Sequence, residues 1–204
     1  MPWLWVVAIA GALLWRGLSE SARVALVASN PYARPSSLLA MKNEALLLHP
    51  ACRGEVGKTG TQDDTIILDW LDIDLSQPLQ QLRQNRVPGE KLFKITATQF
   101  RGDFAQAAID VGLQGREVIP YMLRHGGASR DILLGRRDLE ACRKRLGHKT
   151  YSSVRRYEKS GRLHVATASS PPSLEQYVRE ISAAGGLLAL LRGSRAAAPR
   201  PPRA

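Results

Sequence analysis

Residues 121–157 contain the side chains of this chain that are best suited to phosphate chemistry. Arg124 lies near the start of an expected helix, His148 closes a Leu-Gly-His triplet, and Tyr157 follows nine residues after His148. Breaking a phosphodiester without a metal requires a nucleophile, cations that stabilise the transition state, and an acid for the leaving oxygen. Tyrosine and arginine supply the first two. The phenol has an ordinary pKa of about 10, so it needs strongly positive surroundings to gain phenolate character.

The excess positive charge of the chain lies in the same region. The net charge is +11, and residues 120–162 carry 12 basic and 4 acidic side chains, whereas residues 1–119 carry 12 of each. Because every neutralised phosphate releases counterions, a localised basic block is typical of proteins that bind the phosphate backbone. A basic surface that only keeps the protein soluble is the alternative. The candidate DNA-contacting residues are Arg143, Lys144, Arg145, Lys149, Arg155 and Arg156.

Three motifs carry a resemblance to a known family. LRHGGAS surrounds Arg124, RLGHKT surrounds His148, and VRRYEK surrounds Tyr157. In this order and spacing they resemble the catalytic signature of the tyrosine recombinases, the phage integrase family. YARPSSLLAM resembles the family's first motif and assigns its arginine to Arg34. GKTG places Lys58 where the family keeps a catalytic lysine on a β-hairpin.

The resemblance implies DNA breakage and rejoining through a covalent 3′-phosphotyrosyl intermediate, with double-stranded DNA as the partner and no metal, ATP or other cofactor. In this scheme Tyr157 is the nucleophile. Arg34 and Arg124 hold the non-bridging phosphate oxygens, since a guanidinium can bind two of them at once. Lys58 is the candidate acid for the 5′-oxygen, and His148 hydrogen-bonds the phosphate or the nucleophile.

One catalytic position departs from the family pattern. Tyr121 stands where the family usually has a histidine, three residues before the second arginine, and a phenol is a poor general base at neutral pH. We expect His125 to be structural, because it is next to Arg124 and should point elsewhere on the helix. Tyr151 is a rival nucleophile, but its spacing from His148 differs from that of the family.

The resemblance covers about residues 1–162, which corresponds to the catalytic domain alone. The motifs start close to Met1, so we expect the family's N-terminal DNA-clamp domain to be absent. Together with Tyr121, this leaves open an alternative function, a catalytically impaired DNA-binding remnant of a mobile element.

The elements that must position these residues predict an α+β fold that is mainly helical, with a small β-hairpin. Residues 3–15 are expected to form a buried core helix that pairs antiparallel with the next one, and residues 65–68 the second strand of the hairpin. Pro35 should open a helix whose apolar stripe continues to Leu48, and Ser76 should cap a short exposed helix. The remaining expected helices cover residues 19–30, 98–111 and 136–147, and a further helix that Pro120 opens carries Arg124 and His125.

Residues 3–15 also motivate a rival from another class, a membrane-anchored protein whose basic block meets anionic lipid. The run is too short to span a bilayer comfortably and lacks a basic segment before it, so no membrane association is expected. Cys52 and Cys142 lie far apart without metal-ligand spacing and are expected to be reduced thiols, which suits an intracellular protein. The acidic residues between 63 and 74 lack ligand-loop spacing, so they predict no metal site.

Residues 163–204 are expected to form a separate C-terminal part. It would comprise a linker, an amphipathic helix over residues 173–192 interrupted at Gly185 and Gly186, and a disordered basic tail. The leucine stripe of this helix could pack on its own domain or on a second copy of the chain, and the sequence leaves both open.

Overall fold

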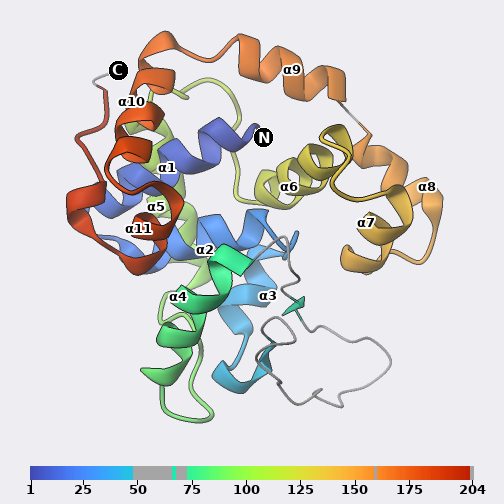
Figure 1. The fold of residues 1–204 in the computed structure, drawn as a ribbon, viewed down its shortest axis with the longest axis horizontal. Coiled ribbons are helices and arrows are strands. Elements are labelled where there is room, and N and C mark those ends of the chain that lie inside the picture. Colours follow the sequence, from blue (N-terminus) through green and yellow to red (C-terminus); the bar gives the residue numbers. More distant parts are fainter. Residues whose placement is uncertain (48–65, 68–72, 159, 203–204) are drawn as a thin grey trace.

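The computed structural model describes residues 1–47, 66–67, 73–158 and 160–202, and these confirm a mainly helical fold (Figure 1). Strands occupy few of the described residues, with β1 at Leu46–Leu47 and β2 at Ile66–Ile67. The longer helices are α1 Trp3–Trp15, α2 Ser19–Ser29, α4 Ile73–Gln84, α5 Ala97–Asp110, α6 Tyr121–Leu133, α9 Ser160–Ala168 and α10 Pro172–Ala183. The shorter ones are α3 Pro35–Ala40, α7 Leu139–Arg145, α8 Tyr151–Val154 and α11 Gly186–Arg192, with 3-10 turns η1 Asn43–Ala45, η3 Arg155–Tyr157 and η4 Arg195–Ala197.

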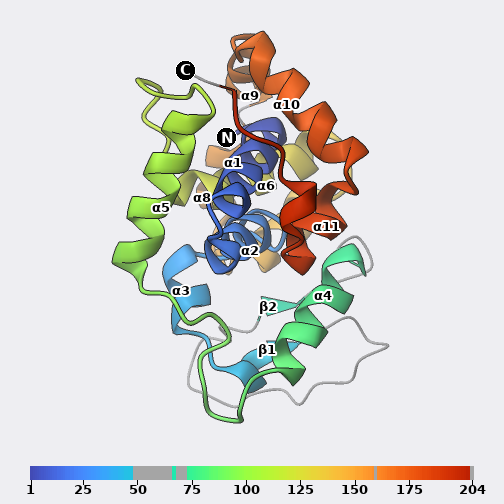
Figure 2. The same cartoon turned by 90° about the vertical axis from the view of Figure 1, so that its left-hand side faces the viewer.

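Helix α1 lies at the centre of the main core. It is apolar on every face, and a helix of this kind is stable in a globular protein only when other elements surround it. Helix α2 returns alongside it, and Figure 2 shows α5 on one side of α1 with α10 and α11 on the other. Residues Val6 to Leu14 are buried as a result. The expectation of a buried core helix over residues 3–15 is confirmed.

The tryptophans of α1 contact other parts of the same chain. Trp5 is 4% exposed, and its indole N–H donates to Ser170 Oγ at 2.7 Å. Trp3 lies under the Arg130 guanidinium, 4.4 Å from ring centroid to Cζ. Among the described residues, no helix is both long enough and apolar enough to cross a membrane. Other parts of the chain thus cover the apolar faces of α1. These faces were the reason for considering a membrane-anchored protein.

The helix expected to continue to Leu48 ends instead at Ala40. Beyond it, the backbone pairs with residues 90–92: the Leu92 N–H donates to the Met41 carbonyl at 3.0 Å, and the Asn43 N–H donates to the Glu90 carbonyl at 2.8 Å. These bonds satisfy backbone groups that a longer helix would have used. Strand β1 then pairs in parallel with β2, Leu46 opposite Ile66. Strand β2 falls inside the strand expected at 65–68, while the rest of the expected hairpin lies outside the described residues.

Helix α4 also differs from the expectation of a short exposed helix. It begins at Ile73, so Ser76 lies within its first turn and does not cap it. Leu75, Leu79 and Leu82 recur at helical spacing and are at most 9% exposed, because this face packs against α11. The helix is therefore part of the core.

The C-terminal part packs into the same core as the rest of the chain. Helix α9 extends to Ala168, into the first residues of the linker expected at 166–173, and the break between α10 and α11 occurs at Gly185 and Gly186, which have φ of 106° and 58°. Leu190 and Leu191 are buried against α2 and α4, so the leucine stripe is used within its own fold. The tail packs as well: the Tyr177 hydroxyl donates to the Pro199 carbonyl at 3.1 Å. The expectation of a tail without packing is wrong for this stretch.

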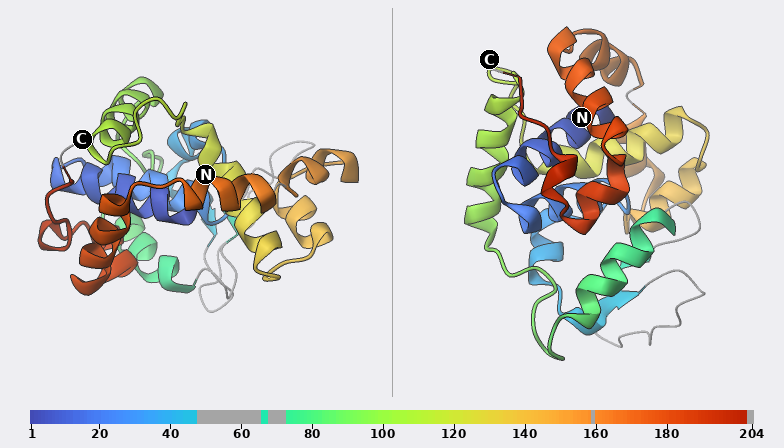
Figure 3. Two further views of the ribbon diagram at one scale, coloured as in Figure 1. Left: turned by 90° about the horizontal axis from the view of Figure 1, so that it is seen from above. Right: turned by 60° about the vertical axis from the view of Figure 1, so that its left-hand side comes forward.

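Helix α6 connects the main core to a second, smaller cluster formed with α7, α8 and η3. These elements lie at the end of the molecule opposite α11 (Figure 3). The close approach of α6 to α2 depends on glycine, since a Cβ at Gly127 would lie 1.8 Å from the Ser29 carbonyl oxygen. No side chain fits at this position without moving one helix.

Gly127→Ala is expected to lower the free energy of unfolding by about 1–3 kcal/mol or more, because the added methyl group overlaps the backbone of α2. Gly102→Ala in α5 is the matched control, since nothing lies within 4 Å of its Cβ position and alanine favours helix by about 0.5–1 kcal/mol. Urea unfolding of both variants measures the difference. If Gly127→Ala and Gly102→Ala have the same free energy of unfolding, Gly127 does not lie against the Ser29 carbonyl of α2.

Candidate functional site

The predicted catalytic residues are positioned by four separate segments. Arg34 precedes α3 with an extended backbone, and Pro35 begins the helix. Helix α6 presents Arg124 one turn after its start. Helix α7 follows the Asp138 cap and ends at Arg145, and Gly147, with a φ of 65°, then reverses the chain and leads into His148. Helix α8 and η3 then return to place Tyr157 beside α6.

Arg124 is the buried centre of this arrangement. It is 5% exposed, and one NH group donates to the Tyr32 carbonyl at 2.7 Å while the other donates to the Leu146 carbonyl. These carbonyls lie two residues before Arg34 and two residues before His148. A guanidinium carries five N–H donors in a rigid plane, so it can bind both carbonyls and still interact with further acceptors. The side chain thereby ties two parts of the site to α6.

Tyr157 is held against Arg124 by contacts on both its backbone and its ring. The Ser129 hydroxyl donates to the Tyr157 carbonyl at 2.8 Å, and the phenol oxygen lies 3.5 Å from His148 Nε2. The ring stacks on His125 with 4.5 Å between centroids and 18° between planes. Tyr157 is only 2% exposed, so its phenol is enclosed within the cluster.

Burial and positive charges both act on the imidazole of His148. Burial lowers the pKa of His148 below its ordinary value of 6.5, and the positive charges of Arg124, Arg34 and Arg156 lower it further. The imidazole is therefore neutral at pH 7, with a nitrogen able to accept a proton. Arg34 and Arg124, which are 90 positions apart in sequence, both act on this one ring.

The phenol of Tyr157 does not have the phenolate character expected from its basic surroundings. Burial raises its pKa above the ordinary value of 10, the hydrogen bond and charge of Arg124 lower it, and Tyr121 raises it. Desolvation disfavours the charged form of a phenol, and here it outweighs the arginine. Tyr121, the residue in the position of the family's histidine, thus contacts the candidate nucleophile.

The expectation that His125 points away from the site is wrong. Residues three and four apart share one face of a helix, so Tyr121, Arg124 and His125 all face Tyr157. His125 contacts Tyr121 edge-on at 4.7 Å as well as stacking on Tyr157. The one-turn spacing from Tyr121 was the sequence signal for this placement.

Tyr151 lies apart from the cluster. It is 53% exposed and hydrogen-bonds Glu140, whose carboxylate also accepts two bonds of 2.8 Å from the Arg143 guanidinium. These partners lower the pKa of Glu140 to about 2, with Arg143 the largest cause. The rival nucleophile is thus held by an acidic side chain and not by the arginines around Tyr157.

The six candidate DNA-contacting residues fall into two groups. Arg143 is bound to Glu140 and to the His148 carbonyl, and Arg145 lies over the Tyr32 ring, with 5.4 Å between Cζ and the ring centroid. Both therefore stabilise α7 and its surroundings. The exposed members are Lys144, Lys149, Arg155 and Arg156. Lys58 lies outside the described residues.

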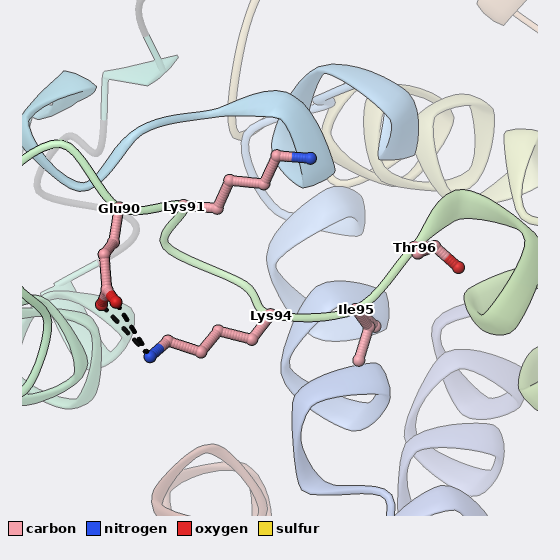
Figure 4. A pocket seen from close by; sticks show the side chains of 5 residues that line it. All are labelled: Glu90, Lys91, Lys94, Ile95 and Thr96. Atoms are coloured by element: carbon pink, nitrogen blue, oxygen red, sulfur yellow. Dashed lines mark hydrogen bonds and ion pairs between the residues drawn. The ribbon is translucent and has the colours of Figure 1, made fainter.

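A shallow hollow of about 320 Å³ lies away from this cluster, in the segment that leads into α5 (Figure 4). Lys94 reaches Glu90 there at 3.2 Å, and Lys91 extends to the other side of the backbone. Thr96 forms a capping box with Gln99, which occupies the N–H groups of Thr96 and Gln99 at the start of α5. The hollow contains none of the predicted site residues.

The chain matches no protein-family model, no curated protein and no solved structure with which it was compared. The resemblance to tyrosine recombinases therefore rests on the motifs around Arg124, His148 and Tyr157.

Nuclear magnetic resonance titration should show the pKa of His148 below 6.5, and Arg34→Gln should raise it towards that value because one of the nearby positive charges is removed. Since the folded state binds this proton less readily than the unfolded state, His148 should also make the protein less stable as the pH falls below about 6.5. Arg179→Gln, which removes an exposed positive charge on α10, is the control. If the pKa of His148 is unchanged in Arg34→Gln, the charge of Arg34 does not act on His148.

Proposed function

We propose that this chain binds double-stranded DNA and breaks and rejoins one strand through Tyr157, as in the family its motifs resemble. The observation that supports this most directly is the cluster of Arg124, His148 and Tyr157, which come from three separate segments, with the exposed Arg34 adding positive charge near His148. A buried core needs no such combination of an arginine, an imidazole and a phenol. A phosphate group, in contrast, is bound by these residue types.

The chemistry follows from these positions. The Tyr157 oxygen attacks the phosphorus, a new O–P bond forms, and the bond to the 5′-oxygen breaks. His148, neutral at pH 7 and 3.5 Å from the phenol, is placed to take the phenol proton. The leaving 5′-oxygen gains a proton, for which Lys58 remains the candidate donor on the family resemblance. Reversal of these steps rejoins the strand, so no external energy source is consumed.

Exposed cations beside the cluster would hold the DNA backbone. Lys144 lies on α7, Lys149 on the connection from α7 to α8, and Arg155 and Arg156 on η3. Contacts to phosphates carry no sequence information, so the binding they provide should be largely sequence-independent and sensitive to salt.

DNA binding without cleavage is the second candidate function. It is favoured by the enclosure of Tyr157, which is 2% exposed, and by the raised pKa of its phenol. Tyr121 also favours this function, because it stands where the family has a histidine and a phenol is a poor general base. Only a search for the covalent intermediate distinguishes the two functions.

Incubation with a nicked suicide DNA substrate should trap a covalent protein–DNA adduct, visible on a denaturing gel. Tyr157→Phe removes one oxygen and should abolish the adduct while DNA affinity stays within about threefold, because the phenol is not among the exposed phosphate-binding groups. Tyr151→Phe should still form the adduct, since its hydroxyl is held by Glu140 away from the cluster.

If Tyr157→Phe still forms the adduct and Tyr151→Phe does not, Tyr151 is the nucleophile. If the parent protein forms no adduct but binds DNA, the second candidate function replaces the first. If it neither forms an adduct nor binds DNA, both are wrong.

The exposed residues Lys144, Lys149, Arg155 and Arg156 are called the basic face below. Glu140 should weaken DNA binding, because its carboxylate pairs with Lys144 of this face and with the neighbouring Arg143. Glu140→Gln is expected to tighten binding and to steepen the dependence of log affinity on log salt by about one unit. Glu175→Gln is matched in charge, since Glu175 pairs with Arg179 on α10, away from this face, and it should leave affinity unchanged. Equal effects of both variants in fluorescence anisotropy would show that only net charge matters.

A further inference from the structure

Tyr32 has an unusual backbone conformation immediately before Arg34. Its φ is 55°, in the left-handed region that bulky residues rarely adopt, and the residue is completely buried. Such a conformation persists only where the surroundings impose it, and it often occurs at functional sites. The turn made here directs the chain from the end of α2 into the segment that carries Arg34.

The side chain of Tyr32 is fixed by Asp131 on α6. The Tyr32 hydroxyl donates to Asp131 Oδ2 at 2.5 Å, and Asp131 is 1% exposed. Arg137 also pairs with this carboxylate, and Arg130 lies 3.4 Å from its other oxygen. A buried carboxylate with these cationic partners is strongly held, so it is a rigid anchor for the phenol.

The backbone of the same residue is fixed by Arg124, whose NH group donates to the Tyr32 carbonyl at 2.7 Å. Asp131 lies seven residues after Arg124, two turns along the same face of α6. Tyr32 is therefore held at both ends by one helix, by Arg124 at its carbonyl and by Asp131 at its hydroxyl. The direction of the chain at Arg34, two residues later, depends on both bonds.

We infer that Tyr32, anchored by Asp131, is the positioning residue that sets Arg34 in the phosphate site. Tyr32 is buried, and its carbonyl, bound by Arg124, lies two residues before Arg34, so it acts on Arg34 through the backbone that carries it. The inference deepens the proposed function, and its catalytic readout depends on that function. Its structural readout, the titration of His148, does not.

Tyr32→Phe removes the anchoring oxygen and keeps the ring. We expect the pKa of His148 to rise in the same direction as in Arg34→Gln, because Arg34 moves away from the imidazole. The double variant Tyr32→Phe/Arg34→Gln should titrate like Arg34→Gln alone. The rate of adduct formation should fall by about tenfold or more, since small displacements of a catalytic group are costly, while DNA affinity stays within about threefold.

The matched control is Tyr177→Phe, which removes another buried tyrosine hydroxyl, one bonded to the Pro199 carbonyl in the main core. It should leave both the His148 titration and the adduct rate unchanged. If Tyr32→Phe does not fold, Asp131→Asn serves instead. Its amide oxygen accepts the Tyr32 bond without a negative charge, and the His148 pKa should rise by less than in Arg34→Gln.

An unchanged His148 pKa in folded Tyr32→Phe, or in Asp131→Asn where that variant is used, overturns the inference. So does an additive rise in the double variant, because Tyr32 would then act independently of Arg34. If the parent protein forms no adduct, the proposed catalytic function fails, and the titration still decides whether Tyr32 positions Arg34.

Discussion

The arrangement of the candidate site depends on the burial of a single cation. Arg124 is almost fully removed from water, and a charge in that position is tolerated only when its donors are satisfied. The carbonyls of Tyr32 and Leu146 satisfy two of them, and each belongs to a segment that leads into another site residue. The buried guanidinium needs hydrogen-bond acceptors, and by supplying them Tyr32, before α3, and Leu146, after α7, are held against α6.

The same burial has an opposite effect on the phenol. Removal from water raises the pKa of Tyr157, and the positive charge of Arg124 lowers it by less. A phosphate entering the site would bring negative charge and additional hydrogen-bond acceptors towards the arginines. Under the proposed function, this closed arrangement would be the site before a phosphate binds, with the phenol stacked on His125 and in edge contact with His148.

The sequence predicted the helices with strong local signals and missed contacts that depend on distant segments. The apolar run located α1, apolar periodicity with a glycine stop located α5, and Pro120 located the start of α6. The helix expected beyond Ala40 failed because residues 41–43 pair with a segment almost fifty residues later, which no local pattern reveals. The C-terminal leucines were compatible with two partners, and only the folded chain shows that α2 and α4 cover them.

Sequence motifs predicted which residue types form the candidate site. They did not predict how deeply each side chain is buried. The motifs named Arg124, His148 and Tyr157, but they could not show that Tyr157 would be enclosed. Opening it would require breaking the Ser129 bond to its carbonyl and the stack on His125. Both partners lie on α6, whereas Tyr157 ends a 3-10 turn after the four-residue helix α8. Short helices gain little stability of their own, so the position of Tyr157 depends on these two contacts with α6 more than on α8. Arg124 is itself held by its bonds to the Tyr32 and Leu146 carbonyls, so under the proposed function the phenol is the group whose contacts a substrate phosphate would have to replace.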